Sequence, residues 1–118
     1  MIRLLILATV ANIVRIHTPA AAMSLEAVDF EVFGTVQGVF FRKYTKEQAD
    51  KLGVRGWCKN TRQGTVVGHM QGPPQKVHQM VIWLRSTGSP NSIIDRVIYR
   101  NGSEIAEYTF EGFEIRKS

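Results

Sequence analysis

Hydrophobic and polar side chains alternate along residues 27–36, which is the period of a strand with one buried face. Three apolar side chains share one face and two carboxylates share the other: Val28, Phe30 and Val32 against Asp29 and Glu31. Beyond Gly38 the apolar positions recur at helical spacing, at Phe41, Tyr44, Ala49 and Leu52. Gly53 follows, where a glycine commonly ends a helix. These patterns predict a strand followed by a helix.

The same two periods predict the rest of the domain. Further strands are expected at residues 54–59, 65–70, 93–99 and 108–115. Turns are expected at residues 61–64 and 101–102, and the alternation slips at Gly112, which indicates a bulge. A second helix starts at the proline pair 73–74, since proline is tolerated in a first turn, and it carries an apolar stripe of Val77, Met80, Val81 and Leu84. Gly88 and Pro90 end it.

The order of these elements is β-α-β-β-α-β-β. Helices with one apolar stripe must bury it, and the face of a sheet is the natural place. The predicted fold class is therefore α+β. We expect a ferredoxin-like β-α-β-β-α-β sandwich with an additional C-terminal strand and two helices on one face of a mostly antiparallel sheet.

Residues 1–22 follow another pattern, and we assign the folded domain to residues 23–118. Arg3 precedes an apolar stretch and residues 20–22 are all alanine, as in a secretory signal peptide. Arginine without acidic residues also fits a mitochondrial transit peptide, and Met23 offers a later start that leaves 1–22 as an optional extension. We expect a cytoplasmic protein, with secretion or mitochondrial import as the alternatives if this segment acts in targeting.

Composition narrows the classes of function. The 118 residues are 44% hydrophobic and 21% charged, as in one globular domain. The formal charge of +5 suits an anionic ligand, but the basic residues do not cluster as a nucleic-acid surface requires. No apolar run is long enough to span a membrane, and the single cysteine, Cys58, excludes an internal disulfide. We expect a monomer that neither binds nucleic acid nor inserts stably into a membrane.

Residues 34–42 leave the first strand and enter the first helix, and they carry the first candidate chemistry. Gly34 and Gly38 permit backbone angles that other residues avoid. The start of a helix presents unpaired N–H groups and a positive potential, which together bind anions. Arg42 adds a planar fork of donors suited to phosphate oxygens. The alternative is that the glycines only shape a turn and that Arg42 is a solvated helix residue.

Residues 56–61 close the second strand and carry the second candidate, Asn60. The two strands of a β-α-β unit run the same way, so their carboxyl ends lie at one edge of the sheet. Topology should therefore bring Asn60 beside Arg42. An asparagine can hold a water by its carbonyl while its NH₂ group faces a phosphate. Taken alone, Asn60 is equally typical of a turn.

Together the two stretches resemble the paired signatures of the acylphosphatase family, Gly34-x-Val36-Gln37-Gly38-Val39-x-Phe41-Arg42 and Gly56-Trp57-x-Lys59-Asn60-Thr61-x-x-Gly64-Thr65-Val66. The resemblance covers about residues 25–116. It implies that Arg42 and Asn60 are catalytic. It also implies that phosphate is bound by the backbone amides of Gln37, Gly38, Val39, Phe40 and Phe41. Gly34 and Thr65 are expected to support the site, Thr65 through a hydrogen bond to Asn60.

The resemblance implies hydrolysis of acyl phosphates by direct attack of water, without a metal, a cofactor or a phosphoenzyme. The expected substrates are small acyl phosphates, with acyl-phosphorylated proteins such as ion pumps as further candidates. The alternative is a non-catalytic anion-binding, RNA-binding or regulatory domain on the same fold. Residues 65–70 contain no aromatic side chain, which argues against an RNA-recognition sheet.

Other reactive side chains receive structural interpretations. Cys58 is expected to be a packed thiol, and Asp29 and Glu31 are expected to be solvated. The histidines lack metal-ligand spacing. We expect His69 on the solvent side of a strand and His78 on the exposed face of a helix.

Overall fold

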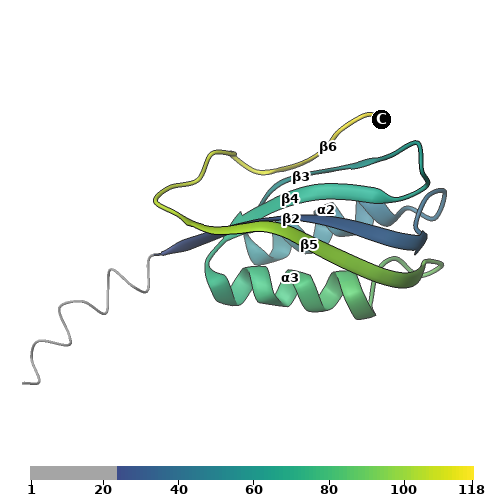
Figure 1. Cartoon of the computed structure of the whole chain (residues 1–118), viewed down its shortest axis with the longest axis horizontal. Helices are drawn as coiled ribbons and strands as arrows, with labels where there is room; N and C mark the ends of the chain where they lie inside the picture. Colours follow the sequence, from purple (N-terminus) through teal and green to yellow (C-terminus); the bar gives the residue numbers. More distant parts are fainter. Residues whose placement is uncertain (1–23) are drawn as a thin grey trace, which may run out of the picture.

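The computed structural model describes residues 24–118, so the predictions for residues 1–22 lie outside the described residues. A five-stranded sheet has the spatial order β5-β2-β4-β3-β6 (Figure 1). The strands are β2 (Leu25–Thr35), β3 (Arg55–Asn60), β4 (Val66–Gly72), β5 (Ile93–Ile105) and β6 (Phe113–Ile115). Neighbouring strands are antiparallel except for the parallel pair β3 and β6. The predicted mostly antiparallel sheet is confirmed.

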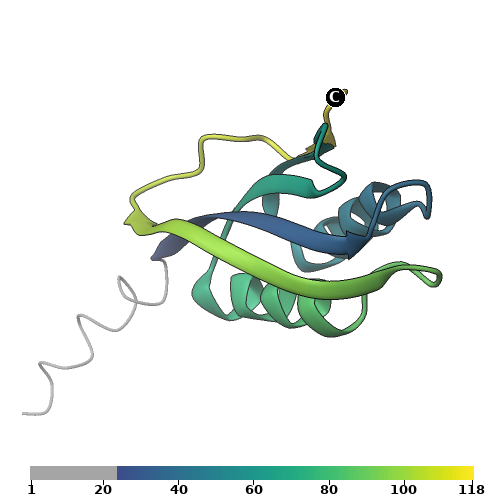
Figure 2. The same ribbon diagram turned by 45° about the vertical axis from the view of Figure 1, so that its right-hand side comes forward.

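Two helices, α2 (Phe41–Leu52) and α3 (Pro74–Ser86), cover one face of this sheet (Figures 1 and 2). The core lies between the two layers, where side chains of the sheet meet side chains of the helices: Phe30, Val32 and Met70 against Phe41, Ala49, Met80 and Leu84. Gly53 ends α2 in the left-handed conformation, and its N–H bonds Ala49 O and Asp50 O. None of the helices in the described part is long and apolar enough to cross a membrane.

The C-terminal third departs from the sequence prediction. The turn expected at residues 101–102 is wrong, because β5 continues through it to Ile105. Asn101 has a positive φ of 56°, and the pairing of β5 with β2 shifts register nearby, so these residues form an irregularity within a strand. The strand expected at 108–115 is confirmed over Phe113–Ile115 alone.

Side-chain contacts hold most of the segment 106–112 against the sheet, and a backbone bond from Gly56 N to Gly112 O at 2.9 Å fixes its end. Thr109 N donates to Gln71 Oε1 at 2.9 Å, and Gln71 Nε2 donates to Thr109 Oγ1 at 2.7 Å. Arg55 donates to Phe110 O at 3.2 Å and lies over the Tyr108 ring at 3.7 Å. The alternating aromatic residues that predict a strand here belong to this side-chain packing and not to a strand.

Candidate active site

The end of β3 lies level with Val32 near the end of β2, because Val32 and Asn60 both pair with Val66 of β4, and β2 continues to Thr35. The loop after β2 and the turn after β3 therefore meet at one edge, as topology predicts. Arg42 and Asn60 line one pocket of ≈ 380 Å³. Its other lining residues are Val36, Gly38, Phe40, Phe41, Lys43 and Ile115.

The loop backbone turns sharply before it enters α2. Gly38 has φ 76° and Phe40 has φ 59°, and both values lie in the left-handed region. The first backbone bond of the helix runs from Tyr44 N to Phe40 O at 3.1 Å, so the preceding N–H groups have no intrahelical partner. Phe40 provides no side-chain cap, and the first turn contains no acidic residue. This end of α2 is open to an anion.

Arg42 stands in this first turn and is half-buried. Within residues 24–118 its guanidinium makes no ion pair with a carboxylate, so its donors face the pocket without a protein counter-ion. The positive charge of Arg42 also acts on the Cys58 thiol. Burial raises the pKa of the Cys58 thiol to about 12, although the Arg42 charge acts in the opposite direction. Cys58 is fully buried, which confirms the packed thiol.

Asn60 ends β3 and is half-buried at the pocket wall. Its Oδ1 atom is buried and has no hydrogen-bond partner within the described residues. A buried acceptor without a donor is unfavourable by about 1–3 kcal/mol. A water or a substrate donor in the pocket would remove that penalty, so the orphaned oxygen marks a position for a polar guest.

The turn that follows Asn60 is closed by threonine hydroxyls. Thr61 Oγ1 and Thr65 Oγ1 lie 2.7 Å apart, and Thr65 Oγ1 donates to Glu31 Oε2 at 2.8 Å. Thr65 therefore stabilises the turn through its contacts with Thr61 and Glu31. The sequence predicts a hydrogen bond from Thr65 to Asn60 instead. The prediction that Glu31 is solvated is wrong, because its side chain is 18% exposed and also pairs with Arg100 at 3.4 Å.

The side chain of Gln37 makes contacts that the sequence does not indicate. Its Nε2 donates to Thr61 O and to Thr65 O, each at 2.9 Å. The acceptors lie 24 and 28 residues along the chain, so no local pattern could reveal them. The Lys43 and Ile115 positions in the pocket wall are likewise additions from the structure.

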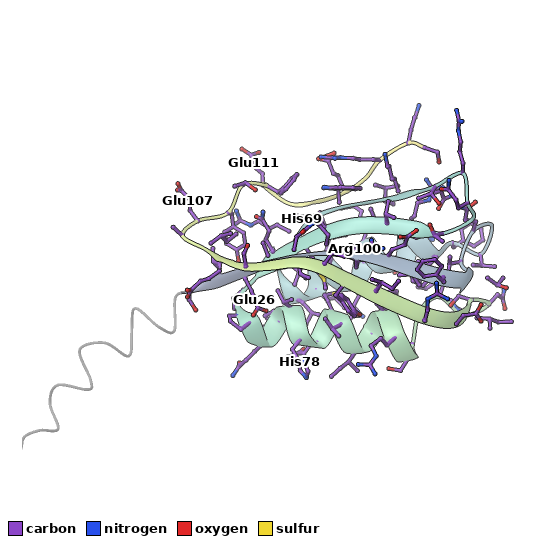
Figure 3. All side chains as sticks on the ribbon, in the orientation of Figure 1. Glu26, His69, His78, Arg100, Glu107 and Glu111 are labelled. Atoms are coloured by element: carbon purple, nitrogen blue, oxygen red, sulfur yellow. The ribbon has the colours of Figure 1, made fainter. Side chains whose placement is uncertain are left out.

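Of the two histidines in the described residues, His69 makes hydrogen-bonding contacts within the sheet and His78 is exposed. His69 lies on the sheet face opposite the helices (Figure 3), where its Nδ1 contacts Asp29 Oδ1 at 2.7 Å and its Nε2 contacts Gln71 Nε2 at 2.9 Å. His78 points away from the sheet on α3, as expected (Figure 3). Within the described range, no group of three or more His, Cys, Asp or Glu is arranged to hold a metal ion.

Comparison with known proteins decides the family. The family model described as "Acylphosphatase" matches residues 28–115. The chain belongs to the acylphosphatase family. It is 57% identical over 96 residues to acylphosphatase-2 of Meleagris gallopavo, which covers 81% of this chain and 93% of that protein. It is 52% identical over 97 residues to acylphosphatase-2 of Homo sapiens, covering 82% and 98%.

A solved acylphosphatase from Coxiella burnetii superimposes on the chain with a TM-score of 0.68. That pair is 30% identical, and the match covers 79% of this chain and 94% of the other. The comparisons confirm the family, the ferredoxin-like fold class and the enzyme class, an acylphosphatase acting on acid anhydrides, that the sequence predicts.

Proposed function

We propose that this acylphosphatase binds the phosphate of an acyl phosphate through Arg42 and the loop amides, and that Asn60 holds the water that attacks it. The observation that carries the proposal is the pairing of two unsatisfied groups in one pocket. These are the buried Asn60 Oδ1 without a donor and the uncapped start of α2 with Arg42 beside it. One group needs a hydrogen-bond donor and the other needs an anion.

The proposed reaction follows from the positions of Asn60 and Arg42. The water donates a hydrogen bond to Asn60 Oδ1 and directs a lone pair at phosphorus. A P–O bond to the water forms while the P–O bond to the acyl group breaks, which releases a carboxylate and inorganic phosphate. A phosphate oxygen accepts the proton of the water. Arg42 and the amides of residues 37–41 stabilise the charge on the equatorial oxygens.

Within residues 24–118, the side chains that line the pocket include no carboxylate and no imidazole. The proposal therefore contains no side-chain general base. The leaving group of an acyl phosphate is a carboxylate, which needs no strong acid to depart. The proposed reaction uses no metal ion, since Arg42 and the helix start supply the positive charge. The cytoplasmic location, the monomeric state and action on acyl-phosphorylated proteins stay predictions.

The test separates phosphate binding from water placement. Hydrolysis of benzoyl phosphate is measured with and without EDTA, and inorganic phosphate is titrated as a competitive inhibitor. Arg42→Ala should lose phosphate inhibition and turnover together. Asn60→Ala should keep phosphate inhibition and lose about 10²–10³ in kcat, as for removal of a group that acts in the transition state. Asn91→Ala, at an exposed asparagine, is the matched control and should behave as the parent.

Three results would contradict the proposal. Near-normal turnover in Asn60→Ala would remove the water-placing role. Loss of activity on chelation, restored by a divalent metal, would remove the metal-independent mechanism. A folded parent protein that binds phosphate without hydrolysing benzoyl phosphate would favour the non-catalytic binding domain.

A further inference from the structure

We propose that Gln37 is a positioning residue whose side-chain amide fixes the turn after Asn60 and thereby sets where Asn60 places the water. This inference rests on the proposed function of Asn60. Gln37 would then have two roles. Its backbone belongs to the phosphate loop, and its side chain links that loop to the turn that carries the water-placing group.

Both N–H donors of the Gln37 side-chain amide are used. A glutamine NH₂ group has two N–H donors, and Gln37 Nε2 has two acceptors, Thr61 O and Thr65 O, each at 2.9 Å. These two carbonyls are the two sides of the turn, since Thr61 N donates to Thr65 O at 2.9 Å. The Gln37 amide therefore clamps the mouth of the turn, directly after Asn60.

The loop and the turn depend on Gln37 to different degrees. The loop is anchored at both ends in the core, because Val36 and Phe41 are each 1% exposed. The turn has exposed residues at its tip, Arg62 and Gln63. Among the described residues, its other side-chain bond to the sheet is the one from Thr65 Oγ1 to Glu31 Oε2. Loss of the Gln37 amide should therefore loosen the turn more than the loop.

Asn60 is sensitive to such loosening because of its place in β3. The pairing of β3 with β6 covers Gly56 to Cys58, whereas Asn60 pairs with Val66 on the β4 side. One peptide bond joins Asn60 to Thr61, the residue that Gln37 holds. A shift of about 1 Å in a positioning contact can cost about a hundredfold in rate. We therefore expect an effect on turnover rather than on phosphate affinity.

The first experiment compares Gln37→Met with the parent enzyme. Methionine has a similar length but no N–H donor. We expect kcat for benzoyl phosphate to fall about tenfold to a hundredfold, while the inhibition constant of inorganic phosphate changes by less than about threefold. Gln63→Met makes the same chemical change at the exposed tip of the same turn and should leave both constants unchanged.

The second experiment is a double-mutant cycle with Asn60→Ala. If Gln37 acts through Asn60, adding Gln37→Met to Asn60→Ala should cause less than about a threefold further loss of kcat. Far-UV circular dichroism and urea denaturation establish that each variant is folded. If Gln37→Met does not fold, Gln37→Asn replaces it, because asparagine keeps the donors on a side chain that is one carbon too short to reach both carbonyls.

The outcomes separate the inference from the function on which it rests. Losses that multiply in the double variant would overturn the role through Asn60 while leaving the function of Asn60 intact. A rise in the phosphate inhibition constant that equals the fall in kcat would assign Gln37 to the loop and also overturn the inference. Normal turnover in Asn60→Ala alone would overturn the proposed function itself.

Discussion

Replacement of Gly34 by alanine is expected to be the most damaging single-methyl change near the site. Gly34 has φ 130°, and a Cβ there would lie 2.1 Å from Ile93 O and 2.8 Å from Asp95 N. Both atoms belong to the backbone of β5, which is paired with β2 at this level, so they cannot rotate away. The strained φ costs about 1–3 kcal/mol for a residue with a side chain. Each ladder hydrogen bond that the clash breaks adds about 0.5–1.5 kcal/mol.

If two ladder hydrogen bonds are broken, these terms give an expected loss of about 2–6 kcal/mol in the free energy of unfolding, against a typical total of about 5–15 kcal/mol. Urea denaturation followed by the fluorescence of Trp57 and Trp83 measures it. Two controls separate strain from steric clash. Gly53→Ala has φ 75° with open space around the new Cβ and should lose about 1–2 kcal/mol. Gly102→Ala, whose new Cβ would lie 4.0 Å from the Val28 side chain, should stay within about 0.5 kcal/mol of the parent.

The reasoning is refuted if Gly34→Ala is no more destabilising than Gly53→Ala. In that case the backbone of β5 would not confine the start of the loop. A folded Gly34→Ala variant should also bind phosphate more weakly, because residues 37–41 follow the displaced segment directly. Unchanged inhibition by phosphate in such a variant would separate the loop geometry from Gly34.

Two further predictions concern ionisable groups. Burial tends to raise the pKa of Asp29, but hydrogen bonds with Asn101 and His69 and the charges of His69 and Arg100 outweigh it and hold the pKa below the ordinary 3.8. Its stabilising effect is thus present above pH 3.8 and lost as the pH falls through the lower folded value. The unfolding free energy of Asp29→Asn should decline less steeply than the parent's in this acid range, and equal slopes would contradict this. Cys58, whose pKa burial raises to about 12, should react with a thiol reagent at pH 8 only as fast as the protein unfolds, and rapid labelling of the folded protein would contradict its burial.

The sequence predicts what depends on local periodicity and on chain direction. The positions of α2 and its glycine cap follow from helical spacing, and the meeting of Arg42 with Asn60 follows from the parallel directions of β2 and β3. The contacts of Gln37 and Glu31 could not be predicted in this way. They join residues 24 to 69 positions apart, and such pairings depend on how the finished sheet brings its strands together.

The two ends of the pocket are positioned by different kinds of interaction. At the phosphate end, the backbone of the loop and the start of α2 determine the geometry, and the positive φ angles of Gly38 and Phe40 belong to this end. Another part of the pocket wall is Ile115 of β6, a strand of three residues. Side-chain donors from other elements hold the chain that leads to it: Gln71 bonds Thr109, and Lys46 donates to Phe113 O at 2.8 Å. Substitutions that remove these donors should therefore shift Ile115 while leaving the phosphate end in place, because the loop is anchored independently in the core.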